Sequence, residues 1–278
     1  MTKITAQEVN KLRQMTGAGM MDCKKALQES DGDIDKAIDY LRKKGQKLAS
    51  KRADKSANEG IVIAKRTDDK TFGAMMMLNC ETDFVAKNQD FIDFANRLID
   101  KAIEAKSACI SCFMGEKMDN GRTIEENITE MVGKTGEKLV LSQYKSISSD
   151  CVIAYNHHGN KLATLVGINM NTPEAEEAGH NTAMQVAAMN PVSIDKDGVP
   201  KDVLDREFEI GKEQARQEGK PENILDKIAE GRLNKFLKEN TLLDQAYIKD
   251  NKVNVSQYLG SVSKELKVNQ FERFMLGE

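Results

Sequence analysis

Residues 72–106, FGAMMMLNCETDFVAKNQDFIDFANRLIDKAIEAK, decide the fold class of this 278-residue chain. Residues 72–80 form an apolar run of a length typical of a strand. From about residue 90 to 106 the apolar positions instead recur along one helical face, at Phe91, Phe94, Ala95, Leu98, Ile99 and Ala102. Residues 79–88 connect the two, and a tight connection of this kind exposes side chains. A strand followed directly by an amphipathic helix predicts an α+β fold.

The same order of elements extends outward from this stretch. Residues 61–64 predict a short strand and residues 67–70 a turn before the strand at 72–80. Residues 107–122 look irregular, and a short helix is expected at 124–132. Further strands are predicted at 138–148, 151–156 and 162–169, followed by a helix from about Thr172 that stops before Asn190-Pro191. Strands followed by a helix, twice, predict two core subdomains with small antiparallel sheets, at 56–137 and 138–201.

Residues 1–55 predict a small helical module and a basic linker. Thr5 and Glu8 have the spacing of a capping box, and Gly17 and Gly19 interrupt the first helix. We expect a second helix at 21–28 and a third from Ile34 that ends at Gly45 as a C-cap. The stretch 46–58 has no apolar face, which indicates a linker or a solvated helix extension.

Residues 202–240 predict an antiparallel helical hairpin, because two periodic stretches flank the turn Gly219-Lys220-Pro221. Its apolar stripe is narrow and its surface heavily charged, so we expect it to project from the core. Residues 241–278 contain short strand-like pieces, at 253–255 and 274–276, and are expected to complete the core.

The composition excludes several classes of protein. No run approaches the length of a membrane span, and residues 1–5 lack the apolar run of a secretory signal, so we expect a cytoplasmic protein that binds no membrane. The five cysteines favour reduced thiols over a disulfide framework. The net charge of −3 argues against a general attraction to nucleic acid. Only residues 1–55 are clearly basic, with 13 Lys and Arg against 8 Asp and Glu.

The motifs give no anchor for an enzyme or for a cofactor. Cys109 and Cys112 form a lone CxxC without a second pair of zinc ligands, so two ordinary thiols in a loop are the favoured interpretation. Gly17 and Gly19 follow no strand and lack the remaining residues of a phosphate-binding loop. With three histidines in the chain, no Ser-His-Asp arrangement stands out.

The segment Thr82-Asp83-Phe84-Val85 has two interpretations. From composition alone, Phe84 and Val85 are core residues and Asp83 is a helix N-cap. An exposed Phe84 on a short, rigid turn would instead be well suited to insert into a pocket of a partner.

Two long motifs resemble the signatures of bacterial elongation factor Ts. They are residues 12–27, LRQMTGAGMMDCKKAL, and residues 79–87, NCETDFVAK. The resemblance continues through residues 184–191, 219–223 and 230–236 and covers essentially the whole chain. It implies a guanine nucleotide exchange factor for elongation factor Tu in translation elongation, with no enzymatic activity of its own. It also implies a module like ubiquitin-associated domains, a core of two subdomains and a coiled-coil hairpin.

The resemblance further implies which residues contact the partner. Asp83 and Phe84, within Thr82–Val85, match the pair that intrudes beside the magnesium site of the GTPase. Lys24 matches a lysine of the N-terminal module that contacts the GTPase domain. Gly136 matches a contact glycine, although Thr135 stands where the family has an apolar residue. His157 matches a histidine that touches the partner's C-terminal domain, and the neighbouring His158 stays an alternative.

Two rival functions stay open at this point. One is a ubiquitin-like or RNA-binding adaptor built on residues 1–55, without exchange activity. The other is a thiol oxidoreductase that uses Cys109 and Cys112. Neither explains two long signatures at once. Whether the complex is a 1:1 pair or a dimer of such pairs also stays open.

Overall fold

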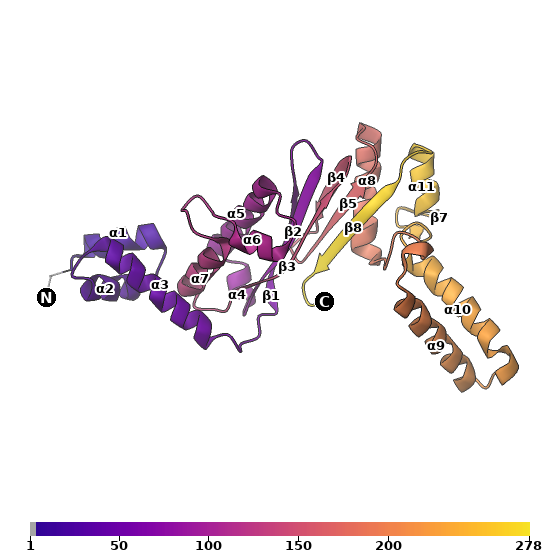
Figure 1. Cartoon of the computed structure of the whole chain (residues 1–278), viewed down its shortest axis with the longest axis horizontal. Coiled ribbons are helices and arrows are strands. Elements are labelled where there is room, and N and C mark those ends of the chain that lie inside the picture. The colour runs from indigo at the N-terminus through magenta and orange to yellow at the C-terminus, as the bar shows by residue number, and fades with distance from the viewer. Residues whose placement is uncertain (1–3) are drawn as a thin grey trace. The chain divides into compact units, whose positions relative to one another are not determined.

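The computed structural model describes residues 4–278, and its mixture of helices and small sheets confirms the α+β fold (Figure 1). Residues 1–3, which belong to the stretch without the apolar run of a secretory signal, lie outside the described residues. The chain forms two compact units. The first comprises the chain up to Ile63, Ala74–Ser146 and Phe274–Glu278, and the second comprises Ala64–Gly73 and Ile147–Arg273. Among residues 4–278, no helix combines the length and the apolar character that crossing a bilayer requires.

Three helices form the N-terminal part of the first unit: α1 (Ala6–Thr16), α2 (Met20–Glu29) and α3 (Ile34–Lys51). The predicted capping box of Thr5 and Glu8 is present at the start of α1. Gly17 ends α1 in the left-handed region, at φ 67°. The helices enclose a small core of Val9, Leu12, Ala18, Cys23, Ala26, Leu27 and Ala37.

The prediction that Gly45 ends the third helix is wrong, because α3 continues to Lys51. Gly45 serves a close approach between helices instead. A Cβ at this position would lie 3.2 Å from the carbonyl oxygen of Thr129 and 3.6 Å from the Cα of Gly133, both in α7 (Ile124–Thr135). A glycine in a helix therefore marks either an end or a crossing, and only the packing distinguishes them.

The first sheet has the order β1 (Glu59–Arg66), β2 (Phe72–Cys80) and β3 (Val140–Ser148). The central strand, β2, is buried at every position, which explains its run of apolar residues from Phe72 to Leu78. The sequence grouped the strand at 138–148 with the strands that follow it, but β3 pairs with β2. The Ser142 hydroxyl accordingly lies 2.5 Å from the Asn79 side-chain oxygen.

Four helices lie between β2 and β3 in the chain: α4 (Asp83–Ala86), α5 (Gln89–Ala105), α6 (Ile110–Gly115) and α7. The predicted apolar face of α5 is buried at all six positions. The expectation that 107–122 is irregular is only partly right, because it contains α6 and ends in a β-bridge between Lys117 and Thr123. Helix α6 has only six residues, too few for an apolar periodicity to reveal it.

The second sheet has the order β4 (Cys151–Asn156), β5 (Leu162–Ile168) and β8 (Val268–Met275), and all of it up to Arg273 belongs to the second unit. Helix α8 (Pro173–Met189) packs on β4 and β5, and a Cβ on its Gly179 would meet Ile153 at 2.7 Å. Both predicted ends of this helix are confirmed. Thr172 caps it ahead of Pro173, and Asn190 ends it in the left-handed region.

Helices α9 (Lys201–Gln217) and α10 (Leu225–Asn240) lie side by side in antiparallel directions, as predicted (Figure 1). Two short 3-10 turns, η1 (Lys196–Gly198) and η2 (Glu222–Ile224), precede them. Their buried seam is narrow and consists of Gly211, Ala215, Leu225 and Ala229.

The remaining elements are β6 (Ala246–Tyr247), β7 (Asp250–Asn254) and α11 (Val255–Val262). The strand expected at 253–255 is therefore wrong at its end, since Asn254 forms a capping box with Gln257 and starts a helix.

Candidate functional site

The segment Thr82–Val85 forms the start of α4, a single helical turn between β2 and α5. The Thr82 hydroxyl accepts the Val85 N–H at 3.4 Å, so the N-cap is Thr82 and the prediction of Asp83 at this position is wrong. The carboxylate of Asp83 accepts a hydrogen bond from Lys87 Nζ at 2.7 Å, one helical turn later. This bond raises the pKa of Lys87 above its ordinary value.

The side chain of Phe84 is 83% exposed. The interpretation of Phe84 as a core residue is therefore wrong, while its neighbour Val85 is half-buried. A large apolar side chain on a short turn of fixed geometry loses little conformational entropy on binding, which favours it as an anchor for a partner.

Glu137, which is distant in sequence, fixes the start of this turn through its carboxylate. Its Oε2 accepts the backbone N–H of Glu81 at 3.1 Å and that of Thr82 at 3.0 Å. Its Oε1 accepts the Thr82 hydroxyl at 2.6 Å. One carboxylate thus satisfies three donors of the strand-to-helix connection, and bonds to a charged acceptor are stronger than neutral ones.

Glu81 returns a matching set of contacts. Its carboxylate accepts the backbone N–H of Lys138 at 2.6 Å. Nη1 of Arg52 donates to both oxygens of the same carboxylate, at 2.8 Å to Oε1 and 2.7 Å to Oε2. The Lys138 N–H, helped by the Arg52 guanidinium, holds the pKa of Glu81 below its ordinary value. We call residues 81, 82, 137 and 138 the carboxylate clamp. It joins the turn before α4 to the segment that follows α7.

Gly136 belongs to the same arrangement, because it ends α7 in the left-handed region at φ 77° and directly precedes Glu137. The hydroxyl of Thr135 is used within this helix end, where it donates to the carbonyl of Met131 at 3.0 Å. The end of α7 also faces the first signature. Gly17 lies against the side chain of Lys134, and Gly19 and Gly136 line one cavity. The structure therefore brings Gly136 together with Thr82–Val85 through Glu137.

Lys24 lies on α2 and is exposed, on an element separate from the clamp. Met20 and Met21, four and three residues earlier on the same helix, are 55% and 73% exposed. Exposed methionines beside a lysine suit an interface, since methionine adapts its shape to a partner.

His157 lies in the exposed turn between β4 and β5. Its Nδ1 is 2.9 Å from the hydroxyl of Tyr155, which orients the ring, and His158 is also exposed. His157 therefore belongs to the second unit, whereas Thr82–Val85, Gly136 and Lys24 belong to the first.

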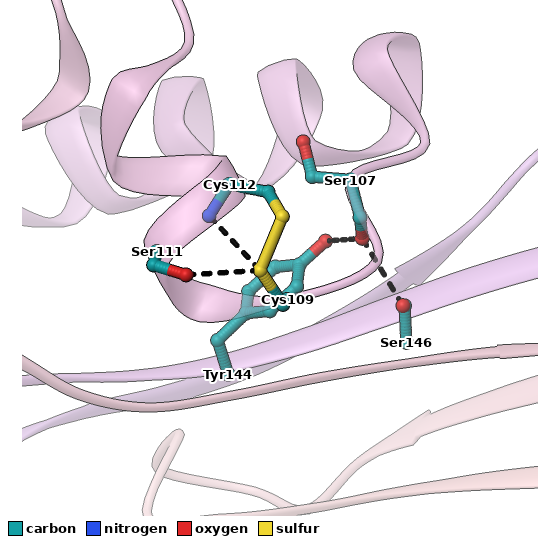
Figure 2. Close-up of a disulfide and its surroundings, with 6 residues drawn as sticks. All are labelled: Ser107, Cys109, Ser111, Cys112, Tyr144 and Ser146. Atoms are coloured by element: carbon teal, nitrogen blue, oxygen red, sulfur yellow. Dashed lines mark hydrogen bonds between the residues drawn. A yellow bond between two sulfur atoms is a disulfide. The ribbon is translucent and has the colours of Figure 1, made fainter.

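The cysteines require a correction, because Cys109 and Cys112 are joined by a disulfide (Figure 2). The prediction of five reduced thiols is wrong for this pair, whose positions at the start of α6 bring the two sulfurs together. Cys23, Cys80 and Cys151 are free and buried. Within residues 4–278 there is no group of three or more His, Cys, Asp or Glu side chains arranged to hold a metal ion.

Sequence reasoning missed Glu137, Glu81 and Arg52. Glu137 contacts Thr82 across 55 positions of sequence, and local periodicity contains no signal for such a contact. The only available hint was the position of Glu137 directly after the left-handed Gly136, where a carboxylate can turn away from the helix.

Comparison with known proteins identifies the family. The family model described as Elongation factor TS matches residues 81–278. An "Elongation factor Ts" of Christiangramia forsetii is 51% identical over the whole of both chains. Those of Amoebophilus asiaticus and Porphyromonas gingivalis are 50% and 46% identical, over 99% and 98% of both chains. The chain therefore belongs to the elongation factor Ts family of translation elongation factors.

Proposed function

We propose that this protein is a guanine nucleotide exchange factor for elongation factor Tu, and that it acts by binding rather than by catalysing a covalent step. In this proposal Phe84 is a wedge that enters the GTPase beside its magnesium site. The observation that carries the proposal is the 83% exposure of Phe84 on a turn that the carboxylate clamp holds in place.

The physical principle is reciprocal coupling between two ligands of one GTPase. If the factor weakens GDP binding by a given ratio, GDP weakens binding of the factor by the same ratio. The factor needs only a higher affinity for the state of the partner whose nucleotide site is deformed. Burial of a Phe side chain in a partner pocket contributes about 1.5–3 kcal/mol toward the cost of that deformation.

The magnesium ion of the partner is the expected point of attack. Mg²⁺ demands near-octahedral geometry and is usually held by few protein ligands, together with waters and the nucleotide phosphates. A small displacement of those ligands loosens the ion and then GDP. Asp83 lies beside Phe84 and is paired with Lys87, so it would hold the turn or extend the contact.

The other matched residues would align the complex. Lys24, exposed beside Met20 and Met21, would contact the GTPase domain and mainly affect the association rate. Gly136 would contact the partner next to the wedge. His157, oriented by Tyr155, would contact another domain of the partner. In this scheme α1–α3 act as the module like ubiquitin-associated domains, and α9 and α10 act as the coiled coil.

The proposal is tested by timing the release of fluorescent GDP from purified elongation factor Tu in a stopped-flow instrument. The wild-type chain should accelerate release. Phe84→Ala should slow the stimulated release by about tenfold or more, because 1.4 kcal/mol corresponds to a factor of ten. Its thermal unfolding should be unchanged, since the side chain is exposed.

A matched control is Ile210→Ala on α9, which removes an apolar side chain that is 42% exposed. It should leave stimulated release unchanged. Wild-type release rates with Phe84→Ala would refute the wedge, and a wild-type chain that does not accelerate release at all would refute the exchange function.

A further inference from the structure

The disulfide between Cys109 and Cys112 has no part in the proposed exchange function. It lies in the first unit, at the start of α6, and Figure 2 shows it beside Tyr144 of β3. Cys112 is exposed and Cys109 is half-buried. A solvent-accessible disulfide can be attacked by a thiol from solution, in contrast to one enclosed in a core.

The segment that carries the two cysteines is attached to β3 on both sides by contacts without sulfur. Before the pair, the Ser107 carbonyl accepts the hydroxyl of Tyr144 at 2.7 Å and that of Ser146 at 3.1 Å. After the pair, the fully buried Phe113 stacks on the ring of Tyr144, with centroids 4.8 Å apart. Cys109 and Cys112, whose Cα atoms are 5.2 Å apart, are therefore held as neighbours whether or not the S–S bond exists.

The sulfur of Cys109 has two donors of its own. It accepts the backbone N–H of Cys112 at 3.0 Å, and the hydroxyl of Ser111 lies 3.1 Å away (Figure 2). Because a disulfide sulfur carries no hydrogen, Ser111 is the donor in this pair. Hydrogen bonds to sulfur stabilise a thiolate, and a stabilised thiolate leaves more readily when a disulfide is attacked.

We propose that Cys109 and Cys112 form a reversible redox site that exchanges with low-molecular-weight thiols. The thiolate of one glutathione attacks the Sγ of the exposed residue Cys112. The S–S bond breaks, and Cys109 leaves with the electron pair as a thiolate. A second glutathione thiolate attacks the glutathione sulfur of the mixed disulfide and releases the Cys112 thiolate and oxidised glutathione. Both protein thiolates take up the protons lost by the two glutathiones, so two electrons and two protons reach the protein.

The environments of the other cysteines confine this chemistry to one pair. Burial raises the pKa of Cys23 and Cys151, and burial together with the charge of Glu137 raises the pKa of Cys80 to about 12. A buried thiol that stays protonated at neutral pH is neither nucleophilic nor accessible. The three free cysteines therefore act as internal controls within the same molecule.

The experiment equilibrates the full chain in buffers of reduced and oxidised glutathione at varied ratios, under native conditions. Thiols are then blocked with N-ethylmaleimide, and the adducts are located by mass spectrometry. Cys109 and Cys112 should become labelled together as the buffer becomes more reducing, while Cys23, Cys80 and Cys151 stay unlabelled. Labelling of both residues in oxidised glutathione alone would overturn the proposal. The proposal would also be overturned if Cys109 and Cys112 stayed disulfide-bonded and unlabelled in reduced glutathione until the chain was unfolded.

The variant Ser111→Ala tests the role of the sulfur environment. Because one hydrogen bond to the leaving thiolate is lost, the midpoint of the labelling curve should shift to a ratio of reduced to oxidised glutathione that is about threefold higher. Ser256→Ala is the matched control, since Ser256 is an exposed serine at the second position of α11, as Ser111 is of α6. Its midpoint should equal that of the wild type. An unchanged midpoint in Ser111→Ala contradicts the assigned stabilisation of Cys109. None of these outcomes depends on elongation factor Tu, so failure here is separate from failure of the exchange function.

Discussion

Replacing Glu137 by Gln tests whether the carboxylate clamp positions Phe84. The substitution keeps the shape of the side chain but removes its charge. In the wild type, three donors from Glu81 and Thr82 reach the two carboxylate oxygens at 2.6–3.1 Å. A hydrogen bond to a charged group contributes about 1.5–3 kcal/mol and a neutral one about 0.5–1.5 kcal/mol.

The expected magnitude follows from these contacts. In the variant the amide oxygen still accepts backbone N–H groups but without a charge, and the amide nitrogen cannot accept the Thr82 hydroxyl. Partial exposure of the clamp reduces the effect, so the turn loses about 1–2 kcal/mol of its fixation. The remaining contacts, such as the Thr82 cap, keep α4 folded. If Phe84 acts only when the turn is ordered, the maximal rate of stimulated GDP release should fall about tenfold.

The assay is the release of fluorescent GDP at increasing concentrations of the factor. The maximal rate should fall, while the half-saturating concentration should change little because Lys24 and His157 are untouched. Glu125→Gln is the matched control, since Glu125 is an exposed residue of the helix that ends just before Glu137. In a Phe84→Ala background, Glu137→Gln should have no further effect. An unchanged maximal rate, or a full additional loss in the double variant, would refute the positioning role.

Two further predictions concern stability. Gly45→Val should destabilise the chain by about 1–3 kcal/mol in urea unfolding, because a side chain there meets the backbone of α7. Gly231→Ala in α10, where a Cβ meets nothing within 4 Å, should instead stabilise it by about 0.5–1 kcal/mol, and equal effects of the two variants would contradict the crossing argument. Glu176 accepts hydrogen bonds from Lys70 at 2.6 Å and from Arg66 at 2.5 Å, which hold its pKa below the ordinary value of 4.5. A lowered carboxyl pKa stabilises the folded state above pH 4.5, and this contribution is lost as the pH falls through the lowered value. The free energy of unfolding of the wild type should therefore exceed that of Glu176→Gln by about 1–2 kcal/mol at about pH 7, and this difference should shrink toward about pH 3. A difference that stays constant with pH would contradict this assignment.

Local signals predicted the elements whose ends depend on neighbouring residues. Helix α8 begins at Thr172-Pro173 and ends at Asn190 because capping and the conformational limits of proline act within a few residues. The capping box of Thr5 and Glu8 is another such case. These features need no knowledge of the tertiary structure, so the sequence alone is sufficient for them.

Features that depend on distant contacts could not be predicted in this way. Phe84 and Phe91 lie close in sequence, yet Phe84 is exposed and Phe91 is fully buried. The difference arises from the clamp at Glu137, which fixes the turn, and from α5, which buries its apolar face. Gly45 was predicted to end a helix because glycine often does so. The helix that it actually packs against, α7, lies far away in sequence and gives no local signal. The composition favoured a buried Phe84, and the resemblance to a family favoured the exposed alternative.

The position of β8 in its sheet has a consequence for the synthesis of the chain. Strand β5 ends at Ile168, but the strand that covers its second edge begins only at Val268, after α8 to α11. At about 5–20 residues per second, a ribosome needs roughly 5–20 s to make the intervening residues. During that interval the apolar strand β5 has one unpaired edge, which other nascent chains could join. The most vulnerable moment for this unit should therefore occur during translation itself, the process in which its family acts.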